Sequence, residues 1–99
     1  MEVTVVDAPD RHRFEARVDG AAAGFAAYRL EHDLVVFTHT VVEPQYEGQG
    51  VGARLVREAL ADVQSRGLAV VPLCPFVKTW LERHPQVAAM LDLRDSAAG

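Results

Sequence analysis

The first half of the chain alternates apolar and polar residues, with short polar segments between the alternating stretches. Between His12 and Val18, apolar residues occupy every second position, the period expected of a half-buried β-strand. Residues 1–7 alternate in a similar way. An Asp19-Gly20 pair follows the second stretch, and Asp-Gly between alternating segments is a strong hairpin signal. We therefore predict two strands and, over residues 21–30, the return strand of a hairpin.

A fourth strand is predicted over residues 34–42, which are rich in valine and contain Phe37. The polar sequence Glu31-His32-Asp33 before it indicates a short turn. Four strands joined by short turns predict an antiparallel meander for the first half of the chain.

The period changes after Pro44 and a glycine-rich stretch. Between Val51 and Arg66, apolar residues recur at helical spacing and form one stripe, with charged residues on the opposite side. Gly67 stands where a helix C-cap belongs. These features predict an amphipathic helix over residues 51–66.

Shorter elements are predicted in the remainder of the chain. Residues 68–73 form an apolar run typical of a buried strand. Pro75 suits the first turn of a second helix over residues 76–83. A short helical turn is expected over residues 86–93, and residues 95–99 are expected to be a frayed tail.

The predicted order of elements is β-β-β-β-α-β-α. A strand, a crossover helix and a further strand imply a right-handed crossover, which makes the last strand parallel to the fourth. The expected fold class is therefore α/β with α+β character, with a mixed and mostly antiparallel sheet. The 99 residues are expected to form a single domain, because the length allows one hydrophobic core.

Composition and charge narrow the range of partners. The chain is 49% hydrophobic with a formal net charge of −4, and its basic residues are scattered, so nucleic acid is not an expected partner. No apolar run approaches the ~20 residues needed to cross a bilayer, and no signal peptide is visible, so no membrane partner and a cytoplasmic location are expected. A single cysteine and four histidines without ligand spacing predict neither a disulfide nor a metal site.

The glycine-rich loop carries the strongest chemical signal. Gly48, Gly50 and Gly52 alternate immediately before and within the first turn of the predicted amphipathic helix. Glycine permits positive φ and removes the Cβ atoms that keep a ligand away from the backbone. The free N–H groups of a first helical turn and the helix dipole suit a pyrophosphate. The alternative is a loop whose glycines only relieve strain. Neither the Walker pattern nor the dinucleotide fingerprint fits.

The loop also resembles motif A of the GNAT superfamily of N-acetyltransferases, written Q/R-x-x-G-x-G/A. The matching sequence runs from Gln49 to Val56. In the usual register the motif starts at Glu47, which replaces the expected Gln or Arg, and a register starting at Gln45 also fits.

Flanking residues make the resemblance more specific. His39-Thr40-Val41-Val42 upstream, and Pro72 to Val77 with His84-Pro85 downstream, resemble the short-chain, YjdJ-type branch of the superfamily. This branch keeps only the acetyl-CoA-binding half of the fold. The resemblance covers about residues 12–93 and implies a minimal GNAT-type acetyl-CoA-binding domain.

In GNAT proteins the fourth and fifth strands splay apart, and the pantetheine arm of acetyl-CoA or coenzyme A enters between them. The resemblance implies that Val41 and Val42 pair with this arm. Pro72 in the last strand agrees with such a splay, and equally with an ordinary edge position. The N–H groups implied to hold the pyrophosphate belong to the loop residues Gly48, Gln49, Gly50, Val51, Gly52 and Ala53.

Many GNAT enzymes protonate the leaving thiolate with a tyrosine in the helix after the fifth strand, and this chain has none there. Cys74, just before that helix, is the candidate substitute, and the alternative is a buried packing cysteine. His39 is the candidate base, unless it only hydrogen-bonds within the sheet. Lys78, the only lysine, is expected either to contact the phosphates of the coenzyme or to be solvated.

The predicted function is acetyl-CoA-dependent transfer of an acetyl group to a primary amine on a small molecule or a protein. A coenzyme A-binding module without significant catalysis, serving as a sensor or interaction partner, is the alternative, because the chain is short. A third hypothesis is an interaction domain whose glycines are only structural. The sequence does not specify the amine or the oligomeric state.

Overall fold

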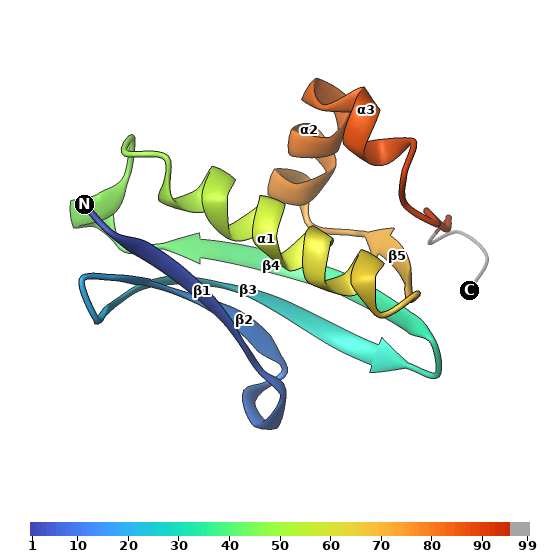
Figure 1. The fold of residues 1–99 in the computed structure, drawn as a ribbon, viewed down its shortest axis with the longest axis horizontal. Helices are drawn as coiled ribbons and strands as arrows, with labels where there is room; N and C mark the ends of the chain where they lie inside the picture. Colours follow the sequence, from blue (N-terminus) through green and yellow to red (C-terminus); the bar gives the residue numbers. More distant parts are fainter. Residues whose placement is uncertain (96–99) are drawn as a thin grey trace.

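The computed structural model describes residues 1–95 and has two layers, a five-stranded sheet with the α-helices on one face (Figure 1). The strands follow their sequence order across the sheet. Strands β1 to β4 pair antiparallel, and β5 pairs parallel to β4, so the predicted meander and crossover are confirmed. The strand bounds are Val3–Ala8 (β1), Arg13–Val18 (β2), Ala21–Glu31 (β3), Leu34–Val42 (β4) and Ala69–Pro72 (β5).

The predicted hairpin between β2 and β3 is confirmed by its backbone angles. Asp19 and Gly20 have φ values of 48° and 87°. Two successive residues with positive φ form the type I′ turn, whose twist matches that of the flanking strands.

The helices also lie where the sequence placed them. Helix α1 spans Val51–Ser65 and α2 spans Pro75–Arg83, with Pro75 in the first turn as predicted. Short 3₁₀ helices η1 (Pro9–Arg11) and η2 (Pro44–Tyr46) lie between strands and before the glycine-rich loop.

The predicted helical turn over residues 86–93 is present, but it is shorter than predicted at its C-terminal end. Helix α3 spans only Pro85–Ala88, and the following segment leaves the helix to lie along the free edge of β5. Val70 N–H donates to the Asp92 carbonyl, and Arg94 N–H donates to the Val70 carbonyl, both at 2.8 Å. Pairing an exposed strand edge satisfies backbone groups that an isolated turn leaves to solvent. Most of the tail predicted over residues 95–99 lies outside the described residues.

The core lies between α1 and the sheet. Each large apolar side chain buried there contributes about 1.5–3 kcal/mol to stability. The helix contributes the whole predicted apolar stripe, made of Val51, Leu55, Val56, Ala59, Leu60 and Val63.

A bulge in β4 decides which side chains face the helices. Tyr28 lies opposite Phe37, but Ala27 lies opposite His39, so Thr38 has no partner on β3. One extra residue in a strand reverses the two faces beyond it. His39 therefore lies on the face away from the helices.

Strands β4 and β5 pair only over Leu34–Phe37 of β4. Cys74 N–H donates to the Phe37 carbonyl at 2.9 Å, and the two backbone segments diverge after this bond. The rest of β4, up to Val42, has no strand on its β5 side within residues 1–95. The splay implied by the resemblance is present.

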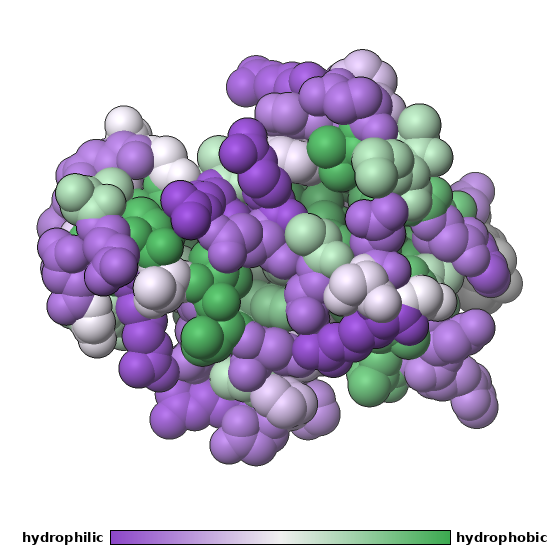
Figure 2. Space-filling model, viewed as in Figure 1, coloured by the Kyte–Doolittle hydropathy of each residue, from purple (hydrophilic) through white to green (hydrophobic). Residues whose placement is uncertain are grey.

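The surface seen in Figure 2 is mainly hydrophilic, with small separate apolar patches. In the part of the chain that the structure describes, none of the helices has the length and apolar character needed to cross a membrane.

Candidate functional site

The loop before α1 has the backbone conformation that the glycines allow. Gly48 and Gly50 have φ values of 77° and 82°, in the left-handed region that other residues rarely adopt. A Cβ atom built at either position meets nothing within 4 Å. The space above this backbone is therefore open, and a side chain there would occupy it.

The same loop presents unused hydrogen-bond donors. No backbone N–H group from Gly48 to Ala53 donates a hydrogen bond within residues 1–95. The first bond of the helix runs from Arg54 N–H to the Gly50 carbonyl, at 3.0 Å. Free N–H groups at the positive end of a helix dipole form an anion-binding site. A pyrophosphate fits this cradle in charge and in donor pattern.

Gly52 has a different role from the other two glycines. A Cβ atom there would lie 2.7 Å from Cζ of Phe76 and 3.2 Å from Cγ2 of Val42. The glycine thus lets α1 approach both β4 and α2. It shapes the wall of the site through packing.

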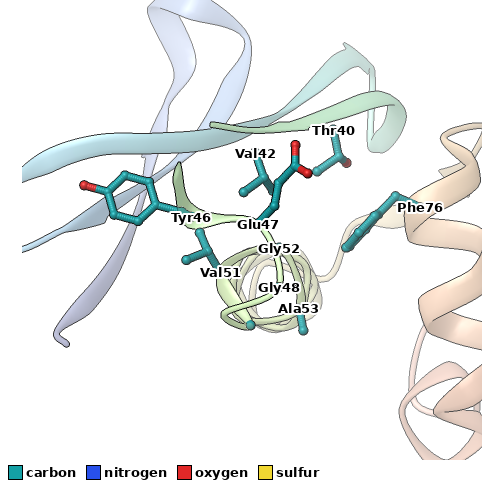
Figure 3. A pocket seen from close by; sticks show the side chains of 10 residues that line it. Thr40, Val42, Tyr46, Glu47, Gly48, Val51, Gly52, Ala53 and Phe76 are labelled. Atoms are coloured by element: carbon teal, nitrogen blue, oxygen red, sulfur yellow. The ribbon is translucent and has the colours of Figure 1, made fainter. Parts of the chain in front are cut away.

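A pocket of about 450 Å³ opens beside the loop (Figure 3). Thr40 and Val42 from β4 border it on one side, and Phe76 from α2 closes it on the other. The Glu47 side chain extends into this space. The remaining lining residues are Tyr46, Gly48, Gly50, Val51, Gly52 and Ala53.

The open edge of β4 presents different backbone groups from those expected. Glu43 N–H donates to the Ala23 carbonyl at 2.8 Å, which marks a hydrogen-bonded pair of the antiparallel ladder. Such pairs recur every second residue, so the backbone of Val41 faces β3. The groups of Thr40 and Val42 face the open edge. The geometry thus favours Val42, as expected, with Thr40 in place of Val41.

Cys74 lies where β4 and β5 part, at the N-cap of α2. Its side chain is 2% exposed, and its Sγ lies 3.2 Å from Oγ1 of Thr40. Thr40 lines the pocket, so it connects the buried thiol to the open space. Thr40 was not among the predicted site residues, because a threonine in a strand carries no signal until its face is known.

His39 lies apart from Cys74. Its ring packs edge-on against Phe25, with ring centroids 5.7 Å apart, on the face of the sheet away from the helices. The structure does not bring the two predicted catalytic residues together, because the bulge at Thr38 turns His39 to the face away from the helices, whereas Cys74 contacts Thr40 on the other face.

Lys78 also lies away from the loop. It lines a separate groove with Pro72, Leu81 and Pro85. The structure does not bring Lys78 and the loop into one pocket.

Tyr28 does not replace the missing acid. Burial, together with a hydrogen bond to Asp7, raises the pKa of Tyr28 well above its ordinary value. Its hydroxyl donates to Asp7 Oδ1 at 2.7 Å, between β1 and β3. Tyr46 lines the pocket near the loop.

Comparisons with known proteins agree with this geometry. The family model described as GCN5-related N-acetyl-transferase matches residues 13–90. A relative from Escherichia coli, [ribosomal protein bS18]-alanine N-acetyltransferase, is 28% identical over 83 residues. The match covers 84% of this chain and 51% of the relative, so the chain spans about half the length of the curated relatives it matches.

Solved structures show the same fold. The crystal structure of the ribosomal-protein-S18-alanine N-acetyltransferase from Escherichia coli aligns with a TM-score of 0.55 and 27% identity, over 59% of this chain and 38% of that one. The NMR structure of a GCN5-like protein from Staphylococcus aureus aligns with a TM-score of 0.68 and 20% identity, over 93% and 88% of the two chains. Because the family match covers most of its length, the chain belongs to the GCN5-related N-acetyltransferase family.

Proposed function

We propose that this chain is an acetyl-CoA-dependent N-acetyltransferase that acetylates a primary amine. The observation that carries the proposal is the run of unused N–H groups from Gly48 to Ala53 beside the open edge of β4. Family membership supports acetyl transfer in general.

The binding mode follows from these two features. The loop N–H groups hold the pyrophosphate, and the backbone of Thr40 and Val42 pairs with the amides of the pantetheine arm. The Glu47 carboxylate opposes an anion in the same pocket. Several donors aimed at one group offset this repulsion, because hydrogen bonds to a charged group are about twice as strong as neutral ones.

Bound acetyl-CoA supplies an activated acetyl group as a thioester. Cys74 and Thr40 are the groups of this chain that lie at the end of the open strand edge. In a direct transfer, the Cys74 thiol gives its proton to the departing sulfur, and the resulting thiolate takes up the proton that the amine nitrogen loses on forming the amide. In a covalent transfer, Cys74 takes the acetyl group, releases coenzyme A as the thiol, and passes the acetyl group to the amine.

A coenzyme A-binding module without significant catalysis is the second candidate. One observation favours it: His39 and Cys74 lie on different faces, so no base and acid are assembled at one point among the described residues.

For the amine that accepts the acetyl group, we propose only its chemical class. The name of the Escherichia coli relative describes an enzyme acting on an alanine of a ribosomal protein. A protein amino terminus and a small primary amine are therefore both candidate acceptors for this chain.

Calorimetry with acetyl-CoA and coenzyme A tests the binding proposal. Thiol release with a panel of amines and peptides then tests transfer. Binding with amine-dependent thiol release supports the enzyme, and binding without release from any amine supports the module. Absence of binding to either coenzyme would overturn both.

A further inference from the structure

The two edges of the sheet differ in how they are covered. Residues 92–94 of the same chain pair with the outer edge of β5, whereas within residues 1–95 β1 pairs with β2 alone. An uncovered edge strand is a template for another chain, and proteins protect such strands with lysine, proline, bulges or very short length. β1 is six residues long, contains neither lysine nor proline, and pairs with β2 without a bulge. Its outer edge is therefore open to a further strand.

The backbone groups that face this edge follow from one hydrogen bond. Asp19 N–H donates to the Glu2 carbonyl at 2.9 Å, which marks a hydrogen-bonded pair of the antiparallel ladder. Such pairs recur every second residue, so the backbone of the even-numbered residues of β1 faces β2. The N–H and C=O groups of the other strand residues face the open edge, and these residues are Val3, Val5 and Asp7.

An acidic groove of about 350 Å³ lies between β1 and α1. Within residues 1–95 its lining has three carboxylates, Asp7 from β1 with Glu58 and Asp62 from α1, and no basic side chain. Arg54 pairs with Glu58, and Arg66 pairs with both aspartates. Three carboxylates thus share two guanidinium groups, so a net negative charge remains beside the open edge.

We propose that the edge of β1 pairs with an extended segment of another protein that carries lysine or arginine at alternate positions. The backbone of the added strand bonds to the outward-facing groups of β1, and its alternate side chains lie on the helix side of the sheet. Basic side chains on that side reach the carboxylates of the groove. Two strands separate β1 from β4, so this surface is separate from the proposed acetyl-CoA site.

The charge of the groove argues against a second copy of this chain as the occupant. Two β1 strands paired about a two-fold axis perpendicular to the sheet have both helix layers on one side. The two acidic grooves would then be neighbours, and β1 itself contributes Asp7 and no basic residue. Juxtaposed like charges are unfavourable at an interface. A basic segment has the matching charge.

Amide hydrogen exchange, followed by NMR without acetyl-CoA, tests the edge. The probe is a short peptide of alternating lysine and valine with blocked termini. In the free protein the three outward-facing N–H groups are expected to exchange faster than those of Thr4 and Val6. The peptide is expected to slow their exchange about tenfold when nine-tenths of the protein is bound, because exchange then requires dissociation. No slowing at millimolar peptide overturns the proposal.

Two control peptides separate charge from backbone pairing. A peptide of alternating glutamate and valine reverses the charge and keeps the alternation. N-methylation of the backbone amides of the lysine peptide keeps the charge and removes the donors that a strand needs. Calorimetry is expected to detect binding of neither control. Binding of either one with the affinity of the lysine peptide overturns the proposal.

Two variants of α1 test the groove. Glu58→Gln and Asp62→Asn are each expected to weaken binding of the lysine peptide about tenfold, the effect of losing a hydrogen bond to a charged group. Glu82→Gln is the matched control, because it removes the same charge from α2, outside this groove. Circular dichroism melting checks that the variants are folded. An equal loss in Glu82→Gln assigns the effect to net charge and overturns the groove assignment.

Analytical ultracentrifugation of the protein without peptide tests the alternative occupant. The protein is expected to remain a monomer at millimolar concentration, with fast exchange at the outward-facing amides of β1. A dimer in which these amides are protected would show that a second copy occupies the edge, and would overturn the proposal.

Discussion

At the scale of single residues, three glycines two positions apart perform different tasks. Gly48 and Gly50 hold left-handed backbone below open space, whereas Gly52 sits under Phe76 and Val42. Substitutions are therefore expected to separate ligand binding from packing. The sequence alone presents the three as one motif.

Gly50→Asp is expected to abolish coenzyme A binding while the domain stays folded. The carboxylate enters the open space above the loop and repels the pyrophosphate, and aspartate tolerates positive φ better than most residues. Calorimetry with coenzyme A measures the effect. Gly20→Asp is the control, since Gly20 has a similar φ of 87° and open surroundings in the distant hairpin. Affinity of Gly50→Asp within a few fold of wild type would contradict the pyrophosphate site.

Gly52→Ala is expected to destabilise the fold by about 1 kcal/mol, at the low end for overpacking. The new methyl group clashes with the Phe76 ring, but Phe76 is 43% exposed and its ring can move. Urea unfolding measures the change. In a Phe76→Ala background most of the cost should vanish, because the ring that clashes with the new methyl group is absent and alanine is a better helix former than glycine. If Gly52→Ala destabilises the Phe76→Ala variant as much as it destabilises wild type, the Phe76 ring is not the source of the strain.

At the scale of elements, the site depends on unequal strand lengths. β4 continues to Val42, whereas its pairing with β5 ends at Phe37. The chain then turns into α2 with Cys74 at the N-cap. The open strand edge, the start of α1 and the start of α2 consequently border one region.

Cys74→Ser is expected to lower amine-dependent thiol release more than tenfold, with little change in the affinity for coenzyme A. The substitution preserves size and the contact with Thr40, but replaces the more acidic thiol. Mass spectrometry of wild type after incubation with acetyl-CoA separates the two mechanisms. An acetyl group on Cys74 that disappears on addition of amine supports the covalent route. Full activity of Cys74→Ser without any adduct would leave Cys74 as a packing residue.

At the scale of the whole molecule, a polar cluster ties three elements together. Tyr28 on β3 donates to Asp7 on β1, and Arg66 after α1 donates to the other oxygen of Asp7 at 2.9 Å. These bonds join the outer part of the sheet to the end of the helix.

The Tyr28 cluster is expected to limit alkaline stability. Burial and Asp7 raise the pKa of Tyr28 in the folded state above the unfolded value of about 10. The stabilisation is therefore fully present below pH ~10 and is lost as the pH rises through the higher folded pKa. Urea unfolding between pH 8 and about 11 should show a steeper loss for wild type than for Tyr28→Phe. Tyr46→Phe is the control, and equal slopes for wild type and Tyr28→Phe would contradict the assignment.

The sequence by itself determined most of the elements, because their signals are local. Alternation in β2, the Asp19-Gly20 turn and the apolar stripe of α1 each depend on neighbours a few residues away. The strand, the turn and the helix are confirmed in the structure. The run of glycines before α1 likewise predicts an anion-binding loop, which stays a prediction.

Tertiary structure alone decided how the site is assembled. The bulge at Thr38 has no local signal, yet it moves His39 to the far face and brings Thr40 to Cys74. Lys78 and Arg83 both lie on α2. Only the packing of α1 beside that helix decides that Arg83 lines the space between the two helices, whereas Lys78 lines a separate groove. Strand register and helix packing depend on residues distant in sequence, so no pattern along the chain specifies which chemical groups meet.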